Sequence, residues 1–225
     1  MDLSSIVRSF GTLSLLNFAR KTAEKLRRGE DEELVALADS VQGAVDSLDM
    51  AYAARRPLTA LWSGATAAKD AADSDLDGSI GALSYDLLSP ANLKGDRKHP
   101  DYRALFPAGN IQFIHGPDRA EVVQVNAIIA YLKAHPEHPM ADRAVELEVK
   151  AAAMDAALDP VSAAESALRA AQAVEKEKRN DLGRTLRKTL AILRAHFMDE
   201  KKVERFFPTV AESKVQEDEG VAAAM

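Results

Sequence analysis

The stretch that decides the fold is residues 160–207, PVSAAESALRAAQAVEKEKRNDLGRTLRKTLAILRAHFMDEKKVERFF. Asp159 followed by Pro160 is typical of a helix N-cap and a proline at the first helical position, where a missing N–H is tolerated. Apolar residues then recur at helical spacing as far as Phe197, with a polar interruption at residues 175–181, and no proline follows before Pro208. We therefore expect one helix of roughly 45 residues, about 70 Å long at 1.5 Å per residue.

A second long helical pattern begins near Asp31 and continues to Leu87. Pro57 interrupts it without a glycine or a turn cluster beside it, so we expect a kink or local break in one rod rather than a reversal of direction. After this proline the apolar positions that continue the same face are Leu58, Leu61, Ala65, Ala68, Ala72, Leu76, Ile80, Leu83 and Leu87.

The N-terminal segment, residues 3–28, is expected to form a single helix. Its last turns are rich in lysine and arginine, which suits a helix C-terminus, and Gly29 is a good residue to follow it. The acidic residues 30–33 come next and suit the start of the following helix.

The middle of the chain has a different composition. Residues 89–100 form a loop by their proline and glycine content, and the aromatic-rich segment 101–117 is too broken by both residues to be a long helix. Helical patterns then start at Asp118 and cover 145–158. The predicted fold class is all-α, an elongated antiparallel bundle of long, partly proline-kinked helices with an irregular aromatic-rich connection in the middle.

We expect one helical domain over residues 1–208, with 1–90 and 101–208 as possible halves. The acidic segment 209–225 lacks an apolar stripe, and we predict that it is a disordered tail.

The composition narrows the classes of function. The chain has 225 residues, 47% of them hydrophobic but only 5% aromatic, and its formal net charge is −6. That charge argues against general binding to nucleic acid or to anionic membranes. Cysteine is absent, which excludes disulfides, thiolate catalysis and zinc–thiolate sites. The first 20 residues resemble neither a signal peptide nor a membrane span, and we expect a cytoplasmic protein.

One motif resembles the start of a calcium loop. Asp73, Asp75 and Asp77 stand at alternate positions and Gly78 follows, as in an EF-hand. The loop needs a glutamate at its twelfth position, where this chain has Ser84. A plain helix with aspartates on its surface is the favoured interpretation, and calcium binding is the alternative.

Other sites of chemistry are weaker. His135 and His138 flank Glu137 and could approach one metal ion, but two histidines in a proline-rich turn are typical of an ordinary turn. No histidine has a glutamate three residues before it, as a di-iron bundle would require. Phosphate-binding glycine loops, HExxH and nucleophile elbows are absent. We predict no catalytic residues, no metal ligands and no cofactor.

The long basic segment 176–205 is also a candidate for nucleic-acid binding. Acidic residues are interleaved with its lysines and arginines, and aromatic residues for base stacking are missing between them. A solvated, salt-bridged helix face is the better interpretation, and we predict no nucleic-acid partner.

Two hypotheses of function follow. The first is a non-enzymatic structural or interaction protein, either a helical scaffold or adaptor with a protein partner or a self-assembling homo-oligomer. The second is a sensory or ligand-binding helical domain with a pocket lined by residues 102–114. The candidate binding residues are Tyr102, Phe106, Phe113, His115 and Phe207.

Two of these aromatic residues stand directly before prolines that end helical patterns. Phe106 precedes Pro107, and Phe207 precedes Pro208. Because each aromatic side chain has about 150–250 Å² to bury, we expect both to anchor helix ends in the core. If they are exposed instead, they would form a docking surface.

Overall fold

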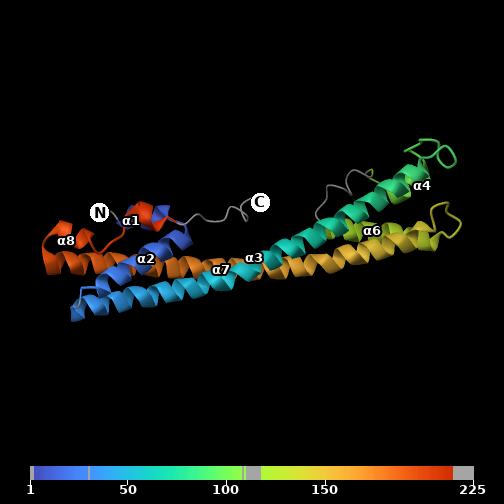
Figure 1. The fold of residues 1–225 in the computed structure, drawn as a ribbon. Helices are drawn as coiled ribbons and strands as arrows, with labels where there is room; N and C mark the ends of the chain where they lie inside the picture. Colours follow the sequence, from blue (N-terminus) through green and yellow to red (C-terminus); the bar gives the residue numbers. More distant parts are fainter. Residues whose placement is uncertain (1–2, 30, 108, 110–117, 215–225) are drawn as a thin grey trace. The chain divides into compact units, whose positions relative to one another are not determined.

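The computed structural model describes residues 3–29, 31–107, 109 and 118–214. Among these residues every regular element is a helix, so the predicted all-α class is confirmed (Figure 1). The helices are α1 (Leu3–Ser9), α2 (Thr12–Arg27), α3 (Glu32–Leu87), α4 (Pro100–Leu105), α6 (Asp118–Ala134), α7 (Arg143–Phe197), α8 (Glu200–Glu204) and α9 (Val210–Ser213).

The chain divides into two compact units. Unit 1 comprises Met1–Ala60 and Ala167–Met225, and unit 2 comprises Leu61–Ser166. The division falls within the long helices α3 and α7 rather than at the loop that follows α3. The units therefore do not coincide with the halves 1–90 and 101–208.

Helices α3 and α7 run antiparallel within each unit. In unit 1, Glu33 Oε2 of α3 lies 3.0 Å from His196 Nδ1 of α7, and Arg55 pairs with Glu175. In unit 2, Asp75 of α3 pairs with Lys150 of α7. The antiparallel arrangement predicted from the sequence is thus present in both units.

Helix α3 runs through Pro57 as one rod without a reversal of direction, and it has no break at the proline, where a kink or local break was expected. Its first turn is capped by Asp31, whose Oδ1 accepts a hydrogen bond of 2.8 Å from the N–H of Glu33. A proline inside a helix removes one backbone hydrogen bond. No glycine or turn cluster stands beside Pro57 to favour a turn, so the helix continues through it.

The predicted start of the second long helix at Pro160 is wrong. Helix α7 begins at Arg143 and contains Pro160 in its interior. Leu158 and Ala164 are buried on either side of the proline, and burial on one continuous face offsets a cost of about 3 kcal/mol for an interior proline. Asp159 is not an N-cap; its carboxylate lies 2.6 Å from Arg119 Nη2 of α6.

The predicted single helix over residues 3–28 is also wrong, because it breaks between α1 and α2. Gly11 has an extended backbone, with φ −66° and ψ 169°, and precedes α2. The break lets Phe10 pack edge-on against Phe18, with ring centroids 5.9 Å apart. Arg179 of α7 donates hydrogen bonds to the carbonyls of Val7 and Phe10, which satisfies the end of α1.

Each unit has its own hydrophobic core. In unit 1 the largest fully buried side chains of α2, α3 and α7 are Leu15, Leu16, Phe18, Leu26, Leu48, Leu182, Leu186 and Leu193. In unit 2 helices α3, α4, α6 and α7 bury Leu76, Ile80, Leu83, Leu87, Leu105, Phe106, Val125, Leu132, Leu147 and Met154.

The predicted disorder directly after Pro208 is wrong for the first residues of that segment. Thr209 caps α9 reciprocally with Glu212, through a backbone hydrogen bond of 2.6 Å to the glutamate carboxylate. Lys21 and Asn17 of α2 donate to the carbonyls of Glu212 and Ser213, at 2.5 and 3.2 Å. These local caps and tertiary bonds order α9 without an apolar stripe. The remainder, residues 215–225, lies outside the described part of the chain.

The contact between α1 and α7 depends on a glycine. A Cβ at Gly183 would lie 2.9 Å from Val7 Cγ1, closer than carbon atoms pack. Gly43 of α3, by contrast, has nothing within 4 Å of the corresponding position and is exposed.

We expect Gly183→Ala to lower the free energy of unfolding by about 1–3 kcal/mol through overpacking. Gly43→Ala should raise it by up to about 1 kcal/mol, because alanine is the better helix former. Urea denaturation of both variants checks this. Equal stabilisation by the two substitutions would contradict the packing of α1 on α7.

Candidate functional site

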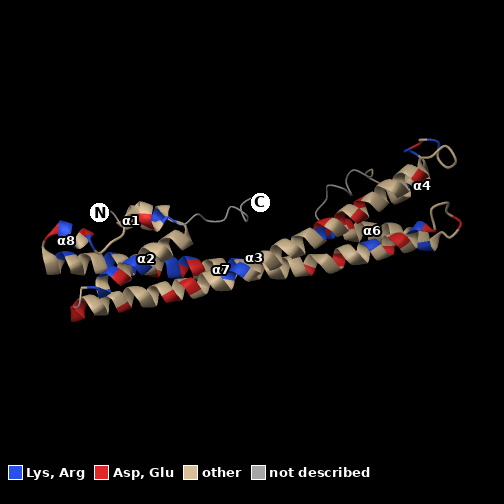
Figure 2. Cartoon of the chain, in the orientation of Figure 1, with Lys and Arg blue, Asp and Glu red and all other residues tan. Residues whose placement is uncertain are grey.

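The middle of α3 places apolar residues on its outside. No residue from Tyr52 to Asp75 is buried, in contrast to the stretches before and after it. The exposed apolar residues between 53 and 71 are Ala53, Ala54, Pro57, Ala60, Leu61, Gly64, Ala67, Ala68 and Ala71. We call these residues the α3 outer face, and the tan ribbon beside the α3 label in Figure 2 belongs to this stretch.

The inner side of the same stretch carries many polar residues. The half-buried positions are Tyr52, Arg55, Leu58, Thr59, Trp62, Ala65, Thr66, Lys69, Ala72 and Asp73. A surface helix normally turns its apolar residues inward and its charged residues outward. The sequence pattern placed Leu61 and Ala68 on the same continuing face as Leu76, which is buried, whereas the structure exposes both side chains.

In unit 1 the inner side of α3 is held by a nearly buried glutamate. Glu175 of α7 is 9% exposed. Its Oε2 lies 2.7 Å from Arg55 Nε, as an ion pair without hydrogen-bond alignment, and its Oε1 accepts a hydrogen bond of 2.6 Å from Thr12 Oγ1. The Arg55 guanidinium also lies 5.4 Å from the centre of the Tyr52 ring. These contacts link α2, α3 and α7 through charge rather than through apolar packing.

In unit 2 a buried carboxyl group faces the inner side of α3. Glu121 of α6 is 3% exposed. Burial raises the pKa of Glu121 to about 8, and the negative charges of Asp77 and Asp73 on α3 and of Asp118 on α6 add to the effect. Glu121 therefore carries a proton at neutral pH. A lone glutamate among the valines and isoleucines of this segment was the sequence signal that could have identified it.

A lysine completes the polar contact between α3 and α6. Lys69 Nζ lies 3.1 Å from Asp118 Oδ2 and 3.3 Å from Asp70 Oδ1. The carboxylate of Asp118 at the start of α6 thus has a lysine of α3 beside it. Among the described residues, no group of three or more histidine, aspartate or glutamate side chains is placed to hold a metal ion.

The segment that resembles a calcium loop is helical. Residues 73–84 lie within α3, so the favoured interpretation as a plain helix is confirmed. The three aspartates point to different neighbours: Asp75 pairs with Lys150 at 3.0 Å, whereas Asp73 and Asp77 lie near Glu121. A continuous helix spreads the three carboxylates around its axis instead of converging them on one ion.

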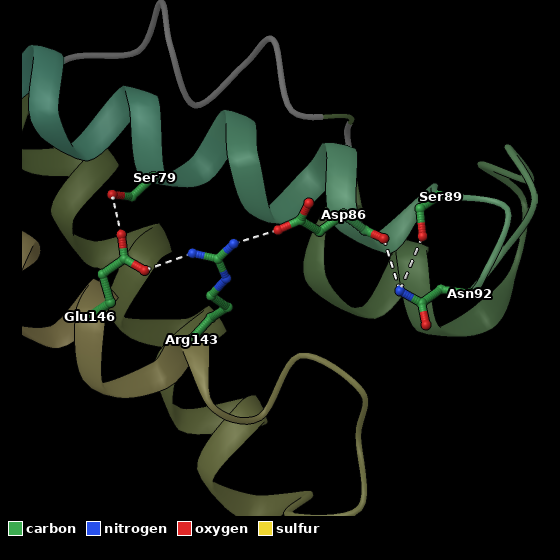
Figure 3. A network of polar contacts seen from close by, with 6 residues as sticks. All are labelled: Ser79, Asp86, Ser89, Asn92, Arg143 and Glu146. Atoms are coloured by element: carbon green, nitrogen blue, oxygen red, sulfur yellow. Dashed lines mark hydrogen bonds and ion pairs between the residues drawn. The ribbon is translucent and has the colours of Figure 1, made fainter.

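A second polar network joins α3 to α7 in unit 2. Figure 3 shows Arg143 between Asp86 and Glu146, which it contacts with separate nitrogens, at 2.8 Å for Glu146. Ser79 Oγ donates to Glu146 Oε1 at 3.1 Å. The hydrogen bond from Arg143, with that from Ser79, lowers the pKa of Glu146. Asn92 donates to the carbonyl of Asp86 at 2.9 Å and thereby ties the following loop to the end of α3.

The histidine pair forms local contacts within its turn. His138 is 9% exposed, and its Nδ1 accepts a hydrogen bond of 3.1 Å from the N–H of Met140. His135 stacks on Tyr131, with ring centroids 4.2 Å apart. Burial lowers the pKa of His138, so this side chain is neutral at physiological pH. These contacts are those of an ordinary structured turn.

The predicted binding residues that the structure describes are core residues. Tyr102 and Phe106 are 3% and 1% exposed in the core of unit 2, and the Tyr102 hydroxyl lies 3.2 Å from Ser84 Oγ. Phe207 is 4% exposed in the core of unit 1 and stacks on Phe18. The expected burial of Phe106 and Phe207 is confirmed. Phe113 and His115 lie outside the described residues.

Two open hollows lie elsewhere on unit 1. One of about 420 Å³ is lined by residues of α1, and one of about 270 Å³ lies between α3 and α7, where Glu33 and Lys188 are on its rim. Neither contains Glu121, Tyr102 or Phe106.

Comparison with known proteins gives no relative. No family model, no curated protein and no solved structure matches the chain. In the described part of the chain, no helix combines the length and the apolar character needed to cross a membrane.

The raised pKa of Glu121 predicts how stability depends on pH. Folding raises this pKa from 4.5 to about 8, so the stabilisation is complete below about 4.5 and is lost as the pH rises through about 8. We expect the melting temperature to fall between about pH 4.5 and about pH 8 and to level off above that. Glu121→Gln, which stays neutral, should flatten this fall.

Glu137→Gln, at an exposed position of the same unit, is the matched control and should keep the slope of the parent protein. An unchanged slope in Glu121→Gln, measured by thermal denaturation, would contradict a buried protonated carboxyl at residue 121.

Proposed function

We propose that this chain is a non-enzymatic helical interaction protein that binds a protein partner through the α3 outer face. The single observation behind the proposal is that no residue from Tyr52 to Asp75 is buried, while nine apolar or small residues of this stretch are exposed. Helices in proteins gain most of their stability from burying an apolar face. This stretch only half-buries Leu58 and Trp62 within the chain itself, so a partner would supply further contact.

The chemistry of the α3 outer face favours another helix as the partner. Its residues are small apart from Pro57 and Leu61, and small residues let two helix axes approach to about 8 Å. Between residues 57 and 68 no exposed residue is charged, and depletion of charged residues is typical of the centre of a protein interface. Leu61, with 59% of its surface exposed, is the natural anchor for such a contact.

The buried carboxyl groups of the structure favour an interaction protein over an enzyme, because they line neither of the two open hollows. Glu121, the group with the most perturbed pKa, is buried against α3 and does not line either hollow. The alternative of a ligand pocket around residues 102–114 gains no support from Tyr102 and Phe106, which pack into the core. The lack of cysteine suits the cytoplasmic setting that we include in the proposal.

Site-specific photocrosslinking tests the proposal. A photoreactive phenylalanine analogue is placed at Leu61 and, as a matched control, at Tyr85, which is 78% exposed on the same helix. In cells that produce the protein, the analogue at residue 61 should give a protein adduct and the analogue at residue 85 should not. An absence of protein adducts at residue 61, or equal adducts at both positions, would contradict the proposed function.

A further inference from the structure

We propose that unit 2 contains an acid-released latch, formed by His99 and His138. The Nδ1 atom of each imidazole accepts a hydrogen bond from a backbone N–H, and it can do so only while it carries no proton. Protonation of the two side chains therefore releases the start of helix α4 and the turn between α6 and α7. This inference goes beyond the proposed function and does not involve the α3 outer face.

His138 holds the turn between α6 and α7. Its Nδ1 accepts a hydrogen bond of 3.1 Å from the N–H of Met140, and only 9% of its surface is exposed. Because an accepting nitrogen carries no proton, the neutral ring has its proton on Nε2. That atom is buried and has no hydrogen-bond partner among the described residues. A second proton can enter only at Nδ1, where it breaks the bond to Met140.

His99 has the same role at the start of α4. Its Nδ1 accepts a hydrogen bond of 3.3 Å from the N–H of Asp101, and this bond caps the helix. Because α4 has only 6 residues, few of its N–H groups find a partner within the helix, and the cap supplies one from outside. In both histidines the donor is the N–H two residues later, an arrangement that asparagine and aspartate also form.

Asp101 offers the protonated rings another partner. Its Oδ2 lies 3.6 Å from His99 Nδ1, and its negative charge also favours the charged form of His138. An imidazolium donates at both nitrogens, so it is repelled by a backbone N–H and attracted by this carboxylate. The latch thus has two states, one with neutral rings bonded to the backbone and one with charged rings drawn to Asp101.

The groups around His138 determine the direction of the pH effect. Burial lowers its pKa, the charge of Asp101 on α4 raises it, His135 in the same turn lowers it, and Glu137 raises it. The Tyr131 ring of α6 lies edge-on, 6.0 Å away. Because the net effect is a pKa below the usual 6.5, the stabilisation is present above about pH 6.5 and is lost as the pH falls through the lowered pKa.

Helix α4 connects the latch to the core of unit 2. Tyr102 and Leu105 of α4, and Phe106 directly after it, are buried in that core. Loss of the cap at the start of α4 and of the turn beside it loosens the packing of these three side chains. Acid thereby exposes apolar surface that is covered at neutral pH.

His135 lies in the same turn and lacks this property. Its Nδ1 is 2.8 Å from the carbonyl oxygen of Tyr131, and a carbonyl can only accept, so this nitrogen already carries the proton of the neutral ring. A second proton enters at Nε2 and leaves the hydrogen bond intact. His135 is therefore a matched control for the two residues of the latch.

Nitrogen-15 NMR of the imidazole rings tests the geometry in the unaltered protein. At neutral pH the neutral forms of His99 and His138 should carry their proton on Nε2, whereas that of His135 should carry it on Nδ1. A proton on Nδ1 of His138 at neutral pH would overturn the inference, because that ring could not accept from Met140.

Hydrogen exchange tests the release. The amides to follow are those of Arg103, Phe106 and Met140, which are hydrogen-bonded at α4 and in the turn. From about pH 7.5 to about pH 5.5 their protection factors should fall by up to about tenfold, because the ordinary histidine pKa of about 6.5 lies one unit above the lower pH. Glu121 stabilises the fold as the pH falls over this range, so it cannot cause the loss.

Asparagine substitutions separate the latch from other acid effects. His99→Asn combined with His138→Asn keeps a neutral acceptor at each position, so the protection of α4 and the turn should no longer depend on pH. His135→Asn should keep the loss seen in the parent protein. Protection in the parent that is the same at both pH values, or an undiminished loss in the double variant, would overturn the inference.

Discussion

A long helix needs an apolar face against something along its whole length, and α3 meets this requirement only near its two ends. Leu34 and Leu48 are buried in the core of unit 1, and Leu76 and Leu87 are buried in the core of unit 2. Between them, over residues 52–75, no residue is buried, and Leu61 is exposed. The proposed function derives from this lack of burial.

Polar contacts fix the rotation of α3 about its own axis in the middle stretch. Arg55 is paired with Glu175 in unit 1, and Lys69 is paired with Asp118 in unit 2. Ion pairs of this kind add little net stability, because desolvation offsets much of the attraction, but they penalise other arrangements. If α3 rotated to bury Leu61, it would remove Arg55 from its carboxylate. The inward charges thus keep the apolar side available to a partner.

Much of the fold followed from the sequence, because helical periodicity and the lack of a turn signal at Pro57 are local features. The proline at 160 was misinterpreted because N1 and interior prolines look alike until the buried faces on both sides are known. The break at Gly11 depends on a tertiary contact, the hydrogen bonds from Arg179, which no local pattern contains. The order of α9 likewise depends on Lys21 of a distant helix.

The candidate site was harder to predict than the fold. An apolar period indicates that a helix has an apolar side, but it does not indicate whether that side faces the same chain or solvent. The pattern therefore placed Leu61 and Ala68 on one face with the buried Leu76, although both are exposed. Tyr102, Phe106 and Phe207 were predicted to bind a ligand because aromatic residues are rare in this chain. In the structure their side chains are buried in the two hydrophobic cores.

Hydrogen exchange of α3 tests the central claim, that the α3 outer face is covered by a protein partner. The account predicts that backbone amides of residues 52–75 exchange more slowly in the protein crosslinked at residue 61 to its partner than in the free protein, while those of residues 76–87, already in a core, do not change. Equal exchange of residues 52–75 in the two samples would contradict the claim.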